Sequence, residues 1–316
     1  TLGGVFVLRS DIISSQARLT LLAAACAVLL SRRGSLAEQI DRLEQGAPPV
    51  IPPAAPSLAS AGSTTAPAHV PTTEFFNGLG GFAVDGNEYV TVLRDGECTP
   101  APWINIVGNA DFGFQVSAEG SGSTWAGNSR ENRLTPWSND PVGDRPGEAI
   151  YVRDQDSGVL WGPTALPVRH ESGVHVARHG RGYSRFEHNR HGIALDLLQF
   201  VPLGASIKVS RLRIRNLSGR PRHLTVTTYV EWVLGTSSAA TGPYVSTELD
   251  PVTGGLLARN LWSGPDARVA FVDLGGRQTA WTGDRAEFIG RNGTVECPAA
   301  LAIGTTLSGR TGAGLD

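Results

Sequence analysis

The chain has 316 residues, with 27 basic and 29 acidic side chains and a formal net charge of −2. This length permits one large domain with appendages, and the near balance of charge gives no electrostatic basis for binding nucleic acid. The three cysteines lie far apart and form no CxxC pair, which argues against a disulfide framework or a cysteine zinc site.

Residues 1–45 predict a helical connector. Its apolar run, Leu19–Leu30, is closed off by arginines on both sides and is shorter than the roughly 18 residues that a membrane-spanning helix needs. We therefore expect this run to form a buried helix and the fragment itself to be soluble. Residues 46–73 follow as a Pro/Ala/Ser linker, because their seven prolines lack backbone donors and favour an extended chain.

Residues 74–316 predict an all-β domain, because short runs of Val, Ile, Thr, Tyr and Phe are broken by Gly, Pro, Asn and Asp. Ile207–Arg215 alternates apolar and polar residues as a half-exposed strand does, and together with Leu224–Val233 it predicts a hairpin. The strand pattern recurs at Arg268–Leu274 and Arg285–Ile289. No strand alternates with a long helix, so we expect a large antiparallel β-sandwich rather than a parallel α/β fold.

Motifs for cofactors and metals are weak. Gly78–Ala83 formally fits G-x-G-x-x-A, but the strand-like Glu88–Arg94 follows where a dinucleotide-binding unit needs a helix, so we interpret it as a glycine turn between strands. The only lysine, Lys208, has no glycine loop before it, which excludes a phosphate-binding loop. The histidines leave three readings open, namely a metal site, a sugar or interface contact, and hydrogen-bonded strand residues; they are His175, His179, His188 and His191.

The segment Gly120–Pro163 carries the best binding candidates. It holds three tryptophans and four arginines in a stretch too rich in Gly and Pro for one long helix. Planar donors beside flat aromatic rings suit a sugar, because Arg and Asn bond to hydroxyls while indole covers the apolar ring face. The candidate carbohydrate-binding residues are Trp125, Arg130, Arg133, Trp137, Asn139 and Asp140. Alternatively, Arg and Asp form ion pairs that hold a long loop over a buried Trp137, and the other tryptophans are expected in the core.

A resemblance to a known family rests on Arg130–Pro141 (RENRLTPWSNDP), supported in the same chain order by Phe76–Leu93 and His179–Pro202. This order resembles the N-terminal β-sandwich, or supersandwich, of glycoside hydrolase family 94. That family contains inverting disaccharide phosphorylases of the cellobiose phosphorylase type and the phosphorylase-like C-terminal region of cyclic β-1,2-glucan synthases. Gly4–Arg9 and Arg32–Ile40 resemble the connector that precedes the sandwich in the synthases.

The resemblance implies an accessory domain, since the family's catalytic Asp lies in an (α/α)6 barrel that follows the sandwich. Its parent would make or phosphorolyse β-1,2-glucan, with inorganic phosphate as co-substrate and no cofactor, while this part packs on the catalytic barrel of the same polypeptide. The sandwich 74–316 would be truncated at its C-terminal end. No acidic residue stands in a paired-carboxylate motif for glycoside hydrolysis, so we expect no catalytic residue here.

The resemblance also implies partners and a location. A β-glucan oligosaccharide would be the ligand, a homodimer is a possible assembly, and the parent would be a membrane protein with this region on the cytoplasmic side of a bacterial inner membrane. The competing interpretation is a stand-alone carbohydrate-binding or dimerisation module without a catalytic role.

Overall fold

The computed structural model describes residues 13–24, 29, 34–40, 70–138, 140, 142–169, 173–264, 268–291 and 293–314. The chain divides into two compact units, Thr1–Ser57 and Leu58–Asp316. In the first unit, helix α1 (Ser15–Ala24) is capped by Ser14, whose Oγ accepts a hydrogen bond from the Ala17 amide at 3.1 Å. None of the described helices has the length and apolar character of a membrane span. Most of the predicted linker 46–73 lies outside the described residues.

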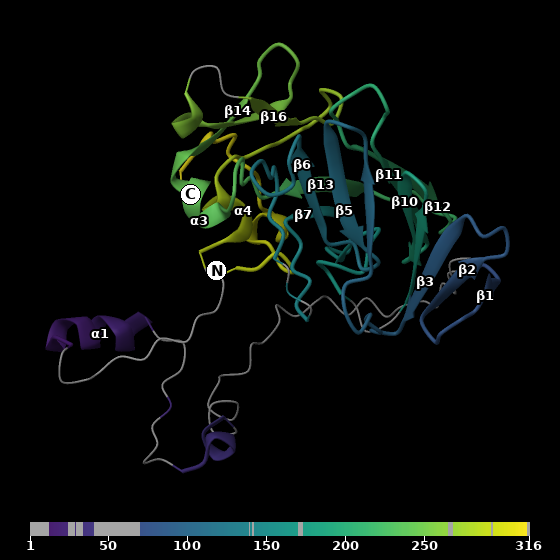
Figure 1. The fold of residues 1–316 in the computed structure, drawn as a ribbon, viewed down its shortest axis with the longest axis horizontal. Coiled ribbons are helices and arrows are strands. Elements are labelled where there is room, and N and C mark those ends of the chain that lie inside the picture. Colours follow the sequence, from purple (N-terminus) through teal and green to yellow (C-terminus); the bar gives the residue numbers. More distant parts are fainter. Residues whose placement is uncertain are drawn as a thin grey trace. The chain divides into compact units, whose positions relative to one another are not determined.

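The second unit is built almost entirely from antiparallel strands (Figure 1). Its largest sheet has seven strands in the order β1-β2-β3-β9-β10-β11-β12. They span β1 Thr73–Glu74, β2 Gly80–Ala83, β3 Glu88–Arg94, β9 Val174–Gly180, β10 Tyr183–Arg190, β11 Ile193–Phe200 and β12 Val209–Asn216.

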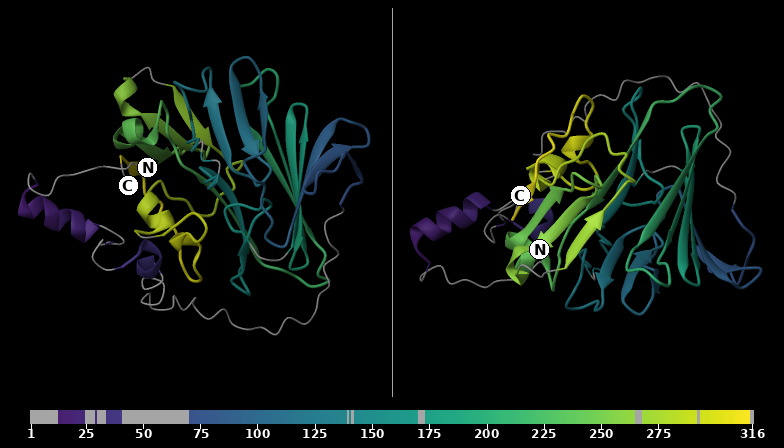
Figure 2. Two further views of the ribbon diagram at one scale, coloured as in Figure 1. Left: turned by 60° about the horizontal axis from the view of Figure 1, so that its bottom comes forward. Right: turned by 90° about the horizontal axis from the view of Figure 1, so that it is seen from above.

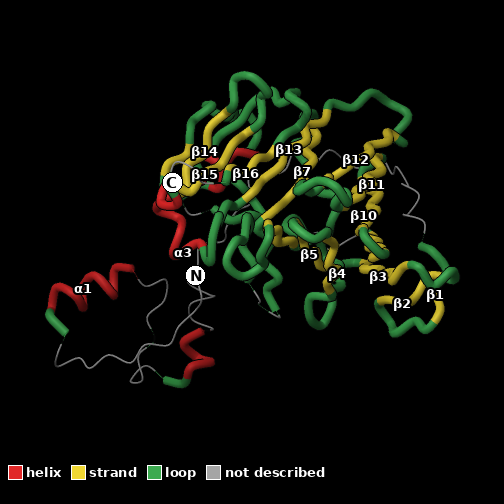
Figure 3. The backbone as a smooth tube through the Cα atoms, turned by 45° about the horizontal axis from the view of Figure 1, so that its top comes forward, coloured by secondary structure: helices red, strands yellow, loops and turns green. Residues whose placement is uncertain are grey.

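Three smaller sheets complete the unit, in the orders β4-β5-β6, β13-β7-β8 and β16-β15-β14-β17. Their strands are β4 Ile104–Gly108, β5 Phe112–Ser117, β6 Gly122–Ala126, β7 Glu148–Asp154, β8 Leu160–Trp161, β13 Leu224–Val230, β14 Val245–Leu249, β15 Leu256–Asn260, β16 Val269–Val272 and β17 Gly312–Ala313. The helical pieces are short: α3 Ser238–Thr241, η2 Gly242–Tyr244, η3 Leu261–Ser263, α4 Arg285–Ile289 and η4 Ala299–Leu301 (Figure 3).

Two sheets face each other across the main core, which confirms the predicted antiparallel sandwich (Figure 2). Side chains of β10 alternate between buried and half-buried positions, so one face of this strand points into the core. Phe114 and Val116 of β5 pack there against Phe186 of β10 and Leu197 of β11, and all four are at most 2% exposed. The β4–β5–β6 sheet is thereby held rigidly on the seven-stranded sheet.

The predicted strand Arg285–Ile289 is wrong, because these residues form helix α4. The Asp284 side chain accepts a hydrogen bond from the Glu287 amide at 2.9 Å and caps the helix. Phe288 then packs on the rings of Tyr151 and Tyr229, so α4 covers a face of the β7–β13 pair.

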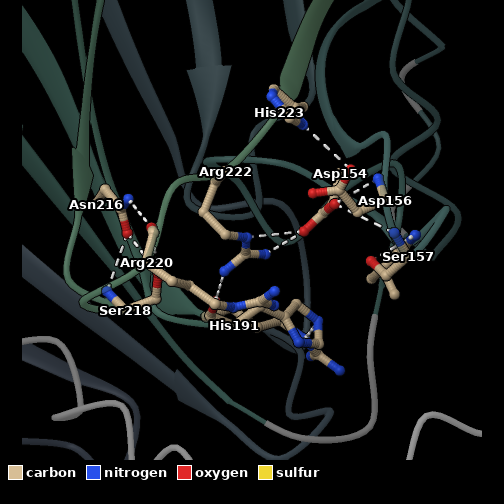
Figure 4. Close-up of polar contacts among 11 residues, drawn as sticks. Asp154, Asp156, Ser157, His191, Asn216, Ser218, Arg220, Arg222 and His223 are labelled. Atoms are coloured by element: carbon tan, nitrogen blue, oxygen red, sulfur yellow. Dashed lines mark hydrogen bonds and ion pairs between the residues drawn. The ribbon is translucent and has the colours of Figure 1, made fainter.

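The predicted hairpin between Ile207–Arg215 and Leu224–Val233 is also wrong. Strand β12 pairs with β11, whereas β13 pairs with β7 in a different sheet. The connection is fixed by Arg222, which forms an ion pair with Asp154 at the end of β7 and donates to the His191 carbonyl (Figure 4). This buried clasp directs the chain from one layer of the sandwich to the other.

The glycine turn predicted at Gly78–Ala83 is confirmed. Gly78 has φ +104°, and the chain enters β2 at Gly80 and pairs with β3, so no helix follows the motif.

Candidate functional site

A small cavity lies beside the start of strand β6, where the chain after Thr135 folds back over the β4–β5–β6 sheet. Its volume is about 200 Å³. Apolar walls come from Pro102, Ile104, Pro136 and Trp137. Polar groups come from Gln115, Ser121, Ser138, Asp140 and Asp144. We call it the Trp137 cavity.

The loop that carries Trp137 starts from a buried anchor. Thr135 is 2% exposed, and its Oγ1 accepts a hydrogen bond from the Thr124 amide at 2.7 Å and donates to Glu148 Oε1 at 2.6 Å. Ser123 Oγ donates to the Thr135 carbonyl at 3.1 Å. Two residues further on, the Trp137 side chain is 45% exposed. A buried anchor therefore supports a loop in which Trp137 is nearly half exposed.

Asp140 holds the turn that follows. Its Oδ1 accepts a hydrogen bond from the Val142 amide at 2.9 Å, and the Val142 and Gly143 amides keep the Asp140 pKa below its usual value. A Cβ atom at Gly143 would lie 2.4 Å from Asp140 Oδ2, so a larger residue would require the Asp140 carboxylate to move. The carboxylate of Asp140 is therefore already engaged by its own loop.

The Asp144 carboxyl differs from that of Asp140 in its burial and its hydrogen bonds. Its Oδ2 is buried and has no hydrogen-bond partner among the described residues. Burial raises the Asp144 pKa, although the hydroxyls of Ser117 and Ser121 favour the ionised form. Its φ of +36° is uncommon for a residue other than glycine. The fold thus holds a poorly solvated carboxyl at the wall of the cavity.

A family comparison agrees with this sandwich. The family model described as Glycosyl hydrolase 94, supersandwich domain, matches residues 87–316. The chain belongs to this family.

Individual relatives of the supersandwich chain cover different shares of it. It is 40% identical over 97% of its length to cyclic beta-(1,2)-glucan synthase NdvB of Rhizobium meliloti (strain 1021), and it spans 11% of that protein. It is 34% identical over 48% of its length to N,N'-diacetylchitobiose phosphorylase of Vibrio furnissii, and 28% identical over 50% to solabiose phosphorylase of Paenibacillus borealis. It spans 19% and 20% of these two proteins, so the chain is a minor part of the length of each relative.

The supersandwich brings only part of the predicted binding set together. Trp137 and Asp140 line the cavity. Arg130 does not: its side chain is 87% exposed and lies 3.3 Å from the neighbouring Glu131 carboxylate. Asn139 lies outside the described residues.

Trp125 and Arg133 hold the sheet together nearby. They form an isolated β-bridge, and Arg133 exchanges two backbone hydrogen bonds of 3.0 Å with Gly235. The Arg133 Nε donates to the Ser129 carbonyl at 3.1 Å. The Trp125 indole lies against Gly113 of the neighbouring strand, where a Cβ would come within 2.7 Å of the ring. Neither residue lines the Trp137 cavity.

A larger groove of about 1200 Å³ runs along β12, β13 and β16. On its wall the only lysine, Lys208, forms an ion pair of 2.6 Å with Glu148 and lies 4.5 Å from the centre of the Phe114 ring. Burial opposes ionisation of Glu148, but Lys208 and the hydroxyls of Thr124 and Thr135 outweigh it and lower the Glu148 pKa. These charged groups are mutually satisfied.

Three of the four histidines make contacts within the seven-stranded sheet. The rings of His175 and His188 stack with centroids 3.8 Å apart, and His188 Nδ1 lies 2.9 Å from the Val174 carbonyl oxygen. His179 Nδ1 lies 3.0 Å from Ser184 Oγ, and burial lowers the His179 pKa to about 4. Within the described parts of the chain, no group of three or more His, Cys, Asp or Glu side chains is arranged to hold a metal.

Two tryptophans test the expectation that most of them lie in the core. Trp161 is fully buried, as expected, whereas Trp262 is 76% exposed and stands beside Tyr244.

Sequence reasoning also missed Asp144. The residue follows Asp140 by four positions, but its contacts with Ser117 and Ser121 arise only when the loop folds back.

Proposed function

We propose that this chain is the accessory β-sandwich of an enzyme that makes or phosphorolyses β-1,2-glucan, and that its Trp137 loop borders the glucan. The observation that carries the proposal is the exposed Trp137 ring over a cavity with hydroxyl, amide and carboxyl groups. An aromatic face beside such groups matches the apolar face and hydroxyl rim of a pyranose. The relative that spans 97% of the chain is named for the synthesis of such a glucan.

The role is supportive rather than catalytic. Inverting cleavage of a glycosidic bond needs a positioned acid, and phosphorolysis uses phosphate in place of the second carboxylate and its water. Asp140 accepts a hydrogen bond from an amide of its own turn, and Asp144 is partly buried beside serines, so both carboxyls already have roles in the loop. In this proposal a catalytic barrel of the same polypeptide carries out the reaction with inorganic phosphate.

The test compares the chain with its full-length parent. Each is incubated with β-1,2-glucan and inorganic phosphate, and release of glucose 1-phosphate is measured. We expect release by the parent only, and we expect Trp137→Ala in the parent to weaken glucan handling. Release by the chain alone would show that an acid within these residues is catalytic and would overturn the proposal.

Dimerisation is the second candidate, and one surface favours it. Phe75, Phe76 and Phe82, around β1 and β2, are 86%, 51% and 47% exposed, and Phe75 is held at φ +53°. Exposed clustered aromatic rings are typical of protein contact surfaces. Analytical ultracentrifugation of the chain and of Phe75→Ser would decide: a concentration-dependent dimer lost in the variant supports this role, and a monomer in both rejects it.

A further inference from the structure

We propose that the Trp137 cavity holds one uncharged sugar ring and that the Asp144 carboxyl accepts a hydrogen bond from a hydroxyl of that ring. This inference rests on the proposed function, which it narrows from a glucan-bordering surface to a single-ring subsite with a named acceptor.

The first support is the unsatisfied carboxyl. Nearly all buried polar atoms of folded proteins have hydrogen-bond partners, so an exception points to a missing partner. Asp144 lines the cavity, and its Oδ2 has no partner in the described part of the chain. Oδ2 has almost no accessible surface in the free chain, so a hydroxyl in the cavity reaches it only when the soft terminal torsion of Asp144 turns the carboxyl toward the cavity.

The second support is backbone geometry. Asp144 has φ +36°, which costs free energy for a residue with a Cβ and persists only when the surroundings impose it. The turn made by Asp140 and Gly143 lies directly before it. The loop is thus strained at the residue that places a carboxyl at the cavity wall.

The third support is size and shape. Sites for drug-sized ligands occupy roughly 300–1,000 Å³, and a water molecule occupies about 30 Å³ of liquid. A cavity of about 200 Å³ therefore suits one pyranose ring rather than a disaccharide. Trp137 and Ile104 supply an apolar wall, while Gln115 and Ser121 supply polar contacts.

Charge selects among sugars. Among the described lining residues there are two carboxyl groups and no lysine or arginine. An anion such as a sugar phosphate is disfavoured there, since phosphate sites use cationic side chains or backbone amides. We therefore expect an uncharged glucosyl unit rather than a sugar phosphate.

The experiment uses the full chain and three variants. Asp144→Asn keeps the side-chain shape and tolerates the left-handed backbone, because Asn adopts this conformation more readily than most residues. Asp250→Asn is the matched control: Asp250 also accepts hydrogen bonds from the amides of its own turn, and it lies outside the cavity. Trp137→Ala supplies an independent test should Asp144→Asn fail to fold, which circular dichroism will show.

Binding of methyl β-D-glucopyranoside is measured by saturation-transfer NMR, with glucose 1-phosphate as competitor and β-1,2-glucan as a second ligand. We expect Asp144→Asn and Trp137→Ala to weaken glucoside binding about tenfold or more, since a charge-assisted hydrogen bond or a sugar platform is lost. Asp250→Asn is expected to leave binding unchanged, and glucose 1-phosphate is expected not to compete.

The other outcomes separate the two proposals. If glucan binds but the folded Asp144→Asn binds the glucoside as the natural chain does, the single-ring subsite is wrong and the glucan-bordering role stands. Equal competition by glucose 1-phosphate also overturns the subsite as described. If neither glucan nor glucoside binds, both proposals fail.

Discussion

Asp144 and Asp154 lie ten residues apart, both are withdrawn from solvent, and their pKa values move in opposite directions. Asp154 is 1% exposed; burial opposes its ionisation, but Arg222 and the amides of Asp156 and Ser157 outweigh burial and lower its pKa (Figure 4). Asp144 has only two serine hydroxyls near it, so burial prevails and raises its pKa.

The difference separates a structural group from the group that we propose binds a ligand. The Asp154 carboxylate receives hydrogen bonds from Arg222 Nε at 2.9 Å and from the Asp156 amide at 2.8 Å, which leaves it little capacity for a ligand. Asp144 retains an oxygen without a partner in the described structure. A buried acidic residue is therefore not enough to indicate a site; the hydrogen bonds of its carboxyl group must be known as well.

The largest expected effect is loss of the clasp. Asp154→Ala leaves the Arg222 guanidinium, 5% exposed, buried without its counter-ion, and we expect the free energy of unfolding to fall by about 3–5 kcal/mol. Urea denaturation measures this. Asp156→Ala, at a side chain 50% exposed, is the control and should change stability by less than about 0.5 kcal/mol. Equal small losses would show that Arg222 is solvated and the clasp unimportant.

A pair of tryptophans extends the comparison. Trp161→Ala removes a fully buried ring and should cost about 3–5 kcal/mol, whereas Trp137→Ala removes a ring that is 45% exposed and should cost less than about 1.5 kcal/mol. Thermal melting of both variants checks this. A large loss in Trp137→Ala would favour the alternative in which this residue only packs beneath its loop.

The effects of substituting Asp144 and Asp154 on stability should change with pH in opposite directions. The pKa of Asp154 is lower in the folded chain than its ordinary value of 3.8. The ionised Asp154 therefore contributes fully to the free energy of unfolding above pH 3.8, and this contribution is lost as the pH falls through the folded pKa. The pKa of Asp144 is higher in the folded chain than 3.8, because of burial and the nearby charge of Asp140. The protonated Asp144 therefore contributes fully to the free energy of unfolding below pH 3.8, and this contribution is lost as the pH rises through the folded pKa. Between pH 3 and 6, Asp154→Asn should therefore become increasingly destabilising relative to the natural chain with rising pH, and Asp144→Asn increasingly favourable. Difference curves of the same sign would contradict the assignment.

The smallest expected effect is that of Asp144→Asn on stability at neutral pH. Asn fits the left-handed backbone and removes a poorly solvated charge, so the free energy of unfolding should stay within about 0.5 kcal/mol or rise slightly. Urea denaturation at pH 7 is sufficient. A loss as large as that of Asp154→Ala would mean that Asp144 holds the loop together.

The sandwich could be predicted because its signals are local. The apolar and polar sequence pattern of Ile207–Arg215 and the motif at Arg130–Pro141 both lie within short stretches, although burial along β12 does not alternate with period two. The partner of β13 could not be predicted, because it depends on Arg222 reaching Asp154, 68 positions away. Helix α4 had a local signal, the Asp284 cap, which a five-residue helix inside a β-rich sequence easily hides.

The candidate site was predicted in part for the same reason. Exposure of Trp137 follows from its place in a polar Gly/Pro-rich loop. Asp144 could not be singled out, because only the folded loop sets it beside Ser117 and Ser121 and leaves one oxygen without a partner.

The most direct test of a glucan contact at the Trp137 cavity is a titration of the ¹⁵N-labelled chain with β-1,2-glucan, following the indole N–H signals of its seven tryptophans. Substitution of single tryptophans assigns the signals. We predict that the Trp137 signal shifts in a saturable way while those of buried Trp161 and exposed Trp262 stay in place. A shift at Trp262 with none at Trp137, or no shift at any indole, would contradict the account.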